Sequence, residues 1–122
     1  MSRPVVLIAG GSRGIGASVA RLAGARGYDV AINYKSNAKA ATTVADAVKA
    51  SGGKSVTLQG DMALEADIER VFDQTTQQLG RVSHFVHSAG IVGKSSRLDA
   101  SSVANIRDVL DVNLFGGLLC AR

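Results

Sequence analysis

Residues 10–16 read Gly10-Gly11-Ser12-Arg13-Gly14-Ile15-Gly16, and this glycine-rich stretch decides the fold. It directly follows a short apolar run, Pro4 to Ala9, of the kind that forms a strand buried on both faces of a sheet. An amphipathic helix is expected after it, with Gly27 as its C-cap, because apolar residues recur there at helical spacing. These residues are Ile15, Val19, Leu22 and Ala23. Strand, glycine turn and helix are therefore contiguous.

A turn of this composition at the start of a helix suits the binding of phosphate groups. Gly10 can make the tight turn, Gly14 lets the backbone approach a pyrophosphate, and Gly16 lets the helix pack closely on the strand. Free N–H groups at the helix N-terminus and the helix dipole favour negative charge. The other loop residues expected near the ligand are Ser12, Arg13 and Ile15. A turn that only reverses the chain is the alternative, although three glycines at this spacing exceed what a turn needs.

The strand and helix pattern repeats along the chain. Strands are expected at residues 30–34, 55–59 and 82–87, and the helices between them carry one apolar face each. The first of these faces contains Ala41, Val44, Ala45 and Val48, and the second contains Leu64, Ile68, Val71, Phe72 and Leu79. Strands that alternate with helices predict right-handed crossovers and a parallel sheet covered on both faces. The sequence therefore predicts a doubly wound parallel α/β fold, represented here by its first four strands and their helices.

A last helix is expected from about residue 101 to the end of the chain. One stripe of it contains Val103, Ile106, Leu110, Leu114 and Gly117, and the other side contains Val109, Val112, Phe115 and Leu119. A helix that is apolar on both sides must bury both sides, one of them against a partner beyond this sheet. Because Ala121 and Arg122 carry no stop signal, we expect residues 1–122 to be the N-terminal part of a single domain, truncated within this helix.

Composition narrows the possible functions. A chain of 122 residues with 46% hydrophobic and 20% charged residues is the size of one globular domain. No apolar run approaches the roughly 20 residues of a membrane helix, and the first residues lack the apolar region of a signal peptide, so we expect a cytoplasmic protein that binds no membrane. The net charge of +4 is dispersed and aromatic residues are scarce, which argues against nucleic acid. Cys120 is expected to be a buried structural thiol, and no metal site is predicted.

The spacing of the glycine stretch, G-x-x-x-G-x-G, resembles the T-G-x-x-x-G-x-G fingerprint of the short-chain dehydrogenase/reductase family, with Ala9 in place of Thr. The resemblance covers essentially the whole chain and implies a Rossmann-like fold. After the third strand the family places an Asp near the adenine, and this chain has Gly60-Asp61-Met62 there. The resemblance therefore implies that Asp61 and Met62 border the adenine. An Asp at this point is also a common turn residue that leads into a helix.

After the fourth strand the family has N-N-A-G, and this chain has His87-Ser88-Ala89-Gly90, which retains only the Ala-Gly half. The resemblance implies that Ser88, Ala89 and Gly90 line the nicotinamide side of a dinucleotide site, at the carboxyl end of a strand. A histidine can serve as a general acid or base. His87 instead replaces a structural amide of the family, so we expect it to hydrogen-bond the backbone, and His84 inside the strand is expected to be structural.

Asn113 lies in the sequence Asp111-Val112-Asn113-Leu114-Phe115-Gly116, on the expected sheet-facing side of the last helix. A buried amide is costly unless its hydrogen bonds are satisfied, so a satisfied core Asn is one interpretation. The other interpretation rests on the resemblance. The family's Asn in this helix holds a water near the catalytic lysine, which implies a catalytic role for Asn113 as a member of a relay.

The end of the second strand indicates which dinucleotide is bound. The residues there are Asn33, Tyr34, Lys35 and Ser36, and we expect all four in the cofactor site. A carboxylate at this position would bind the ribose hydroxyls and repel a 2′-phosphate, but Asp29 comes too early, before the strand. Lys35 and Arg13 can instead flank a 2′-phosphate through charge-assisted contacts. We therefore expect NADP as the cofactor, with NAD as the alternative.

In the family, a Ser and a Tyr-x-x-x-Lys pair perform the catalysis, but Tyr28 and Tyr34 are followed four residues later by Ile32 and Ala38. The resemblance implies an oxidoreductase that transfers hydride between nicotinamide and an alcohol or ketone, with its catalytic groups in a missing C-terminal half and this chain inactive alone. It also implies a homodimer or homotetramer. The alternative is a catalytically inert dinucleotide-binding module that senses redox state or scaffolds a complex.

Overall fold

The computed structural model describes residues 3–91 and 93–122. In this part of the chain, four parallel strands form one sheet in the order β3-β2-β1-β4. They are β1 (Val5–Ala9), β2 (Asp29–Tyr34), β3 (Ser55–Gln59) and β4 (Val82–His87). The helices between them are α1 (Gly14–Ala25), α2 (Ala38–Ala50) and α3 (Glu65–Leu79). The last elements are a 3₁₀ turn, η1 (Leu98–Ala100), then α4 (Val103–Leu110), the π-helical η2 (Asp111–Phe115) and α5 (Gly116–Ala121).

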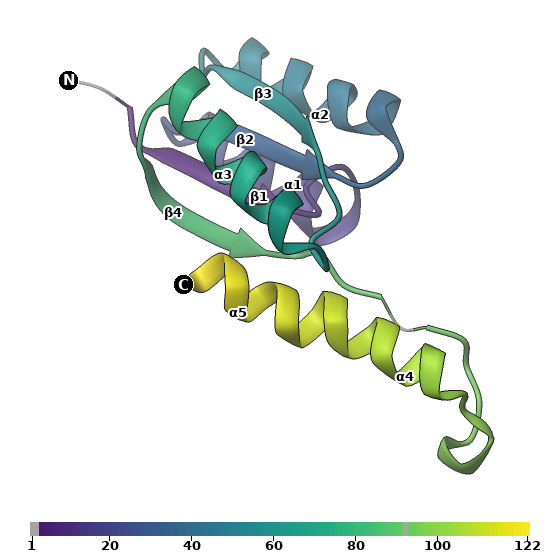
Figure 1. Cartoon of the computed structure of the whole chain (residues 1–122). Helices are drawn as coiled ribbons and strands as arrows, with labels where there is room; N and C mark the ends of the chain where they lie inside the picture. The colour runs from purple at the N-terminus through teal and green to yellow at the C-terminus, as the bar shows by residue number, and fades with distance from the viewer. Residues whose placement is uncertain (1–2, 92) are drawn as a thin grey trace.

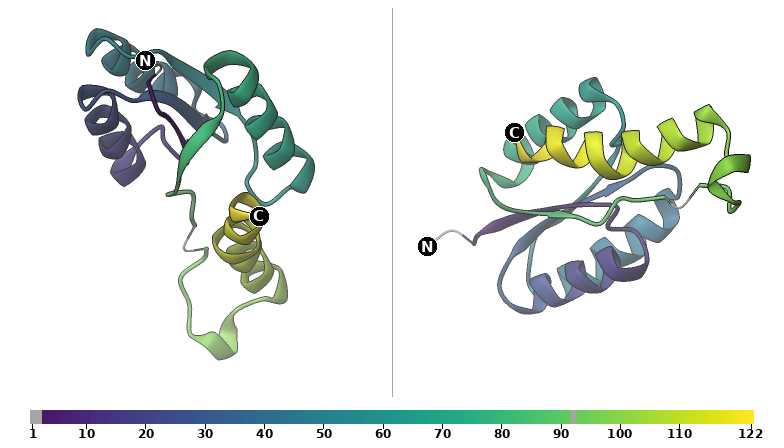
Figure 2. Two further views of the ribbon diagram at one scale, coloured as in Figure 1. Left: turned by 90° about the vertical axis from the view of Figure 1, so that its left-hand side faces the viewer. Right: turned by 90° about the horizontal axis from the view of Figure 1, so that it is seen from below.

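The helices cover the sheet in two layers, as Figures 1 and 2 show. α1 and α2 lie on one face, and α3 lies on the other face with α5 beside it. β4 pairs with β1 although it follows β3 in the chain, so the strand order reverses between β1 and β4. Such a reversal is the place where doubly wound folds bind ligands, outside the carboxyl ends of the strands. The prediction of a doubly wound parallel α/β fold is confirmed.

The two central strands, β1 and β2, are buried on both faces, as the continuous apolar run of β1 predicts. Alternate residues of these strands serve two separate cores. The core under α1 and α2 includes Val6, Ile8, Val30 and Ile32, and the core under α3 and α5 includes Leu7, Ala9 and Ala31. On α2, the predicted apolar face is confirmed, because Ala41, Val44, Ala45 and Val48 are the buried residues of this helix.

The predicted buried stripe of α1 is confirmed for Val19 and Ala23, which pack against the core, and wrong for Ile15 and Leu22. Ile15 and Leu22 are 78% and 53% exposed. The residues that α1 buries are Gly16, Ala17, Ala20 and Gly24. Their small size lets α1 approach its neighbours closely, since a Cβ built on Gly24 would lie only 3.0 Å from Cγ1 of Val48 on α2. Close packing therefore selects the face with the smallest side chains, which a count of apolar residues does not reveal.

The predicted burial of apolar side chains also fails in part at the start of α3 and along the last helix. Leu64 is the N-cap residue of α3 and is 53% exposed, whereas Ile68 and Val71 are buried as expected. The expected last helix is interrupted by the π-helical turn η2, and its apolar side chains are largely exposed. The most exposed of them are Val103, Leu110, Leu114 and Leu118. Figure 1 shows the reason, because α4 extends away from the sheet and only α5 lies beside β4.

The docking of α5 depends on a close contact with the turn that follows β3. A Cβ on Gly116 would collide with the carbonyl oxygen of Met62, so only glycine allows this approach. Cys120 lies one turn further along, with its Sγ 3.9 Å from Sδ of Met62. Its predicted burial is confirmed at 8% exposure, and burial raises the pKa of the Cys120 thiol from 9.0 to about 11.

Replacing Ile32 in the core between the sheet and α1 tests the packing of the central strands. Ile32→Ala is expected to lower the free energy of unfolding by about 2–5 kcal/mol, because it leaves a cavity at a fully buried site. Leu22→Ala on the exposed side of α1 is the matched control and should change it by less than about 0.5 kcal/mol. Urea denaturation of the purified variants measures both. Equal losses would contradict the assignment of the α1 face.

The raised pKa of Cys120 predicts a pH-dependent loss of stability. The unfolded thiol ionises near pH 9.0 and the folded thiol near 11, so burial of the neutral thiol contributes fully below pH 9.0. That contribution is lost as the pH rises from 9.0 to about 11, because the unfolded state releases its proton first. Urea denaturation between pH 8 and about pH 10 should show a steeper loss in the wild type than in Cys120→Ala. Parallel curves would contradict the prediction.

Candidate functional site

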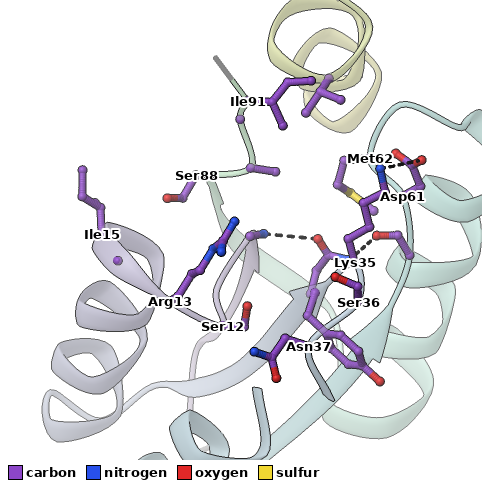
Figure 3. Close-up of a pocket in the computed structure, with 18 residues that line it drawn as sticks. Ser12, Arg13, Ile15, Lys35, Ser36, Asn37, Asp61, Met62, Ser88 and Ile91 are labelled. Atoms are coloured by element: carbon purple, nitrogen blue, oxygen red, sulfur yellow. Dashed lines mark hydrogen bonds and ion pairs between the residues drawn. The ribbon is translucent and has the colours of Figure 1, made fainter. Parts of the chain in front are cut away.

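A cavity of about 400 Å³ opens at the carboxyl ends of the strands, where the strand order reverses. Figure 3 shows the side chains that line it. They come from the turn after β1 (Gly10 and 12–15), the end of β2 (33–37), the turn after β3 (60–62), the loop after β4 (88–91) and Val112. The cavity thus brings together the residues predicted for the cofactor site, apart from Gly16, which lies behind it.

Four lining residues escaped the sequence analysis: Asn37, Gly60, Ile91 and Val112. Asn37 carried a recognisable signal, because it is an N-cap residue that follows a strand and accepts a hydrogen bond from the Ala40 N–H at 3.0 Å. Ile91 follows directly on the Ala-Gly motif. Val112 reaches the cavity from the far end of the sequence, and no local pattern could have placed it there.

The turn between β1 and α1 is shaped by glycines in three different ways. Gly10 has a φ of +74°, and a Cβ on it would lie 2.7 Å from the backbone of Ala89. A Cβ on Gly16 would collide with the carbonyl oxygen of Gly10, so the first turn of α1 lies directly on the loop. Gly14 has a φ of +58° and no atoms within 4 Å of its Cβ position, which leaves its backbone open to the cavity. These conformations and contacts exclude larger residues.

The N-terminus of α1 supplies hydrogen-bond donors to this cavity. Its N-cap residue, Arg13, makes no side-chain capping bond. The first N–H groups of a helix have no partners within the helix, and together with the helix dipole they attract anions. Gly14 and Ile15, the first two residues of α1, line the cavity. The site is therefore built to receive a negatively charged group such as a phosphate.

The buried amide group of Asn33 connects the ends of three strands at the cavity. It is 2% exposed, and its Oδ1 accepts a hydrogen bond from the Gly10 N–H at 3.2 Å. Its Nδ2 donates to the carbonyl oxygens of Leu58 and Gly60, at 3.2 and 3.1 Å. Both amide hydrogens are thus used within the protein, and one side chain connects the ends of β1, β2 and β3. Direct contact between Asn33 and a cofactor stays a prediction.

Two cations reach the cavity from different elements. Arg13 extends from the glycine turn and Lys35 from the end of β2, as Figure 3 shows. The Nζ of Lys35 lies 3.6 Å from Oδ2 of Asp61, and both side chains are partly exposed. Asp29, in contrast, is the first residue of β2 and pairs with Arg3 at 3.1 Å at the opposite end of the strand. The prediction that Asp29 precedes the strand is wrong, but its side chain is far from the cavity end of β2.

The turn that carries Asp61 is held rigidly by neighbouring groups. Oδ1 of Asp61 accepts a hydrogen bond from the Ala63 N–H at 2.9 Å, and the Asp61 N–H donates to Oδ2 of Asp67 at 2.8 Å. The hydrogen bond from the Asp61 backbone is the main reason that the pKa of Asp67 lies below its ordinary value of 3.8. Partial desolvation opposes this lowering of the pKa, and Arg70, 3.4 Å away, adds to it. The two predicted adenine-side residues, Asp61 and Met62, both line the cavity.

Asn113 lies in the π-helical turn η2 and binds the loop after β4. Its Oδ1 accepts from the Ile91 N–H and its Nδ2 donates to the Ile91 carbonyl oxygen, each at 2.8 Å. The prediction that Asn113 is buried against the sheet is wrong, because the residue is exposed. A π-helical turn inserts an extra residue into a helix and is frequent at functional sites. The role of Asn113 in a relay stays a prediction.

The two histidines of β4 have different environments. His87 packs against Phe85, with ring centroids 6.2 Å apart, and against Gly117, whose Cβ position is 3.1 Å from its Cδ2. Neither ring nitrogen of His87 bonds to any described residue, so the prediction of a backbone hydrogen bond is wrong. The nearest element, α5, presents a glycine and not an acceptor. His84 lies 3.0 Å from the Ser83 hydroxyl and edge-on to Tyr28, which is in keeping with a structural role.

No helix in the described part of the chain is both long enough and apolar enough to span a membrane. Residues 3–91 and 93–122 also contain no group of three or more His, Cys, Asp and Glu side chains that could bind a metal ion.

Fold and cavity together define a Rossmann-like α/β protein. Comparisons with known proteins show which family it belongs to. The family model for short chain dehydrogenases matches residues 4–122. The chain is 35% identical over 118 residues to the uncharacterized oxidoreductase YgfF of Escherichia coli, covering 97% of this chain and 48% of that protein. It is 34% identical to the 3-oxoacyl-[acyl-carrier-protein] reductase FabG of Staphylococcus epidermidis, covering 95% and 47%. The chain belongs to the short-chain dehydrogenase/reductase family.

The solved structures agree with this assignment. A putative dehydrogenase from Burkholderia cenocepacia with bound NADP superposes with a TM-score of 0.91 at 30% identity, covering 98% of this chain and 46% of that one. The chain thus spans about half the length of the relatives it matches.

Gly16→Ala tests the contact between the glycine turn and α1. The added methyl group would collide with the Gly10 carbonyl, and we expect the free energy of unfolding to fall by about 1–3 kcal/mol. NADPH binding should weaken as well, because the turn must shift. Urea denaturation and NADPH fluorescence titration measure these effects. Ser18→Ala, on the exposed side of the same helix, is the control. Unchanged stability and binding in Gly16→Ala would refute the contact.

Proposed function

We propose that the protein is an NADP-dependent oxidoreductase that transfers hydride between nicotinamide and an alcohol or ketone substrate. This chain supplies the cofactor-binding part of a single Rossmann-fold domain. The observation that carries the proposal is the open, uncapped start of α1 beside Gly14, at the edge of the cavity where the strand order reverses. Membership of the family and its named reductases supports it.

The residues that line the cavity are proposed to contact the parts of a dinucleotide in the following order. The helix start at Gly14 would receive the pyrophosphate. Asp61 and Met62 would border the adenine, and the loop 88–90 would border the nicotinamide. When bound, the nicotinamide supplies or accepts the hydride. The residues of this chain bind and orient the cofactor, and Asn113, through its grip on the loop, is proposed to take part in the relay.

The preference for NADP rests on the charges at the end of β2. Lys35 and Arg13 would flank the 2′-phosphate, and no carboxylate of β2 lies at this end of the strand. The pair between Lys35 and Asp61 is partly exposed, and such pairs contribute little to stability. A phosphate with two charges can therefore draw Lys35 away from Asp61. The relative with bound NADP supports this choice, and NAD remains the second cofactor to test.

The catalytic Ser and Tyr-x-x-x-Lys are proposed to lie in the half of the relatives that this chain does not span. The chain alone should therefore bind NADPH without turnover. We further propose a homodimer or homotetramer, because the apolar side chains along α4 and η2 are largely exposed in this chain. A cytoplasmic location is proposed in keeping with the single free thiol.

A catalytically inert dinucleotide-binding module is the second candidate. It is favoured by one observation, the departure of His87-Ser88 from the N-N of the family motif, with both His87 ring nitrogens unpaired among the described residues. The two candidates differ in turnover. The intact protein is expected to oxidise NADPH in the presence of small ketones or 3-oxoacyl thioesters, measured as loss of absorbance. Binding of NADPH without turnover on any of these carbonyls would favour the inert module.

Charge removal tests the cofactor preference. Lys35→Ala and Arg13→Ala should each weaken NADPH binding about tenfold, because each removes a charge-assisted contact to the 2′-phosphate. NADH binding should hardly change, since NADH lacks that phosphate. Lys39→Ala, which removes an exposed positive charge outside the cavity, is the control. Fluorescence titration gives the dissociation constants. Equal weakening for NADH and NADPH would contradict the assignment.

A further inference from the structure

We propose that Asn105 is a positioning residue for the nicotinamide end of the cavity, acting through the loop after β4. The Oδ1 of Asn105 accepts a hydrogen bond from the Lys94 N–H at 2.8 Å, and its Nδ2 donates to the Lys94 carbonyl oxygen at 3.4 Å. The same Nδ2 donates to Oγ of Ser101 at 3.0 Å. The inference rests on the proposed function, since it concerns the orientation of the bound cofactor and substrate.

Asn105 repeats the arrangement seen at Asn113. Each side chain binds both the N–H and the C=O of one loop residue, Lys94 or Ile91. Asn105 and Asn113 are eight residues apart on the helix, a rise of about 12 Å, and the loop residues that they bind are three apart in the sequence. The loop is bound to α4 and η2 at two points and runs antiparallel to them.

Gly93 shows how closely the loop lies against the helix between these two points. Its φ is +68°, and a Cβ on it would lie 2.5 Å from Oδ1 of Asn105 and 2.8 Å from Cγ2 of Val109. No other residue fits without moving the loop or the helix. Gly90 is similarly close to the other asparagine, with its Cβ position 3.2 Å from Oδ1 of Asn113. Both glycines let the backbone reach the amide groups.

Asn105 is itself held in place by the start of α4. Its own N–H donates to Oγ of Ser102, the N-cap residue, at 3.0 Å. The cap thus holds the main chain of Asn105, and Ser101 holds its side-chain amide group. A side chain fixed in this way can determine the position of Lys94.

The loop transmits this position to the cavity. Ile91 lines the cavity and is bound by Asn113, whose neighbour Val112 also lines it. Loss of the Asn105 side chain would keep the hydrogen bonds between Asn113 and Ile91 but remove those to Lys94, so the loop could shift relative to the helix. Arg13 and Lys35 lie in the turns after β1 and β2, apart in the sequence from the loop after β4 and from α4. The expected defect is therefore in the use of nicotinamide and substrate, with affinity for NADPH retained.

Asn105→Leu in the intact protein tests the inference with three measurements. Amide hydrogen exchange at Lys94 should accelerate, while exchange at Ile91 stays slow. The value of kcat/KM for a ketone should fall about tenfold, with the dissociation constant of NADPH unchanged within about twofold. The fluorescence of bound NADPH, which reports the surroundings of the nicotinamide, should change. Asn105→Asp keeps the acceptor for the Lys94 N–H and should restore part of each property.

Asp108→Asn, an exposed change of similar size on the same helix, is the matched control and should leave all three measurements unchanged. Unaltered exchange at Lys94 in Asn105→Leu would show that the hydrogen bonds between Asn105 and Lys94 do not hold the loop. Faster exchange with unaltered kcat/KM and unaltered NADPH fluorescence would overturn the positioning role. If the wild-type protein binds NADPH but reduces no carbonyl, the proposed function fails, and exchange and fluorescence still decide the role of Asn105.

Discussion

The contact between Gly16 and the carbonyl oxygen of Gly10 is the constraint on which the rest of this structure depends. It brings the first turn of α1 onto the loop after β1, and it leaves the N–H groups of that turn facing the cavity. Gly10 of the same loop also lies close to the backbone of Ala89, and this contact fixes the loop after β4 relative to α1. A larger residue at either glycine would separate the helix from the strand and open the site.

Polar groups extend this arrangement to the other strands. The amide of Asn33 binds the loop of β1 and two carbonyl groups at the end of β3, which fixes three strand ends by one buried side chain. Unpaired, those groups would carry the cost of burial without compensation. The loop after β4 depends on asparagines of the last helix in the same manner. The rim of the cavity is thus set by amide side chains that bond to main-chain atoms.

The fold and most of the cavity could be predicted from local patterns, because glycine spacing and strand periodicity depend on neighbours in the sequence. The buried face of α1 could not, since Gly16, Ala17, Ala20 and Gly24 were selected by the closeness of packing and not by hydrophobicity. The orientation of Asn113 was also missed, because a π-helical turn changes the face on which later residues lie. Val112, in the same π-helical turn, lines the cavity although it is far in the sequence from the other lining residues.

Asn33, near the end of β2, and Lys35, just after it, serve two different properties of the site. Asn33 is buried and holds three strand ends together, whereas Lys35, two residues further on, is exposed and its side chain pairs with Asp61. Changes at Lys35 can therefore alter the charge presented to a ligand without disturbing the sheet. A substitution at residue 35 would therefore change the charge at the edge of the cavity while the hydrogen bonds of Asn33 stay in place.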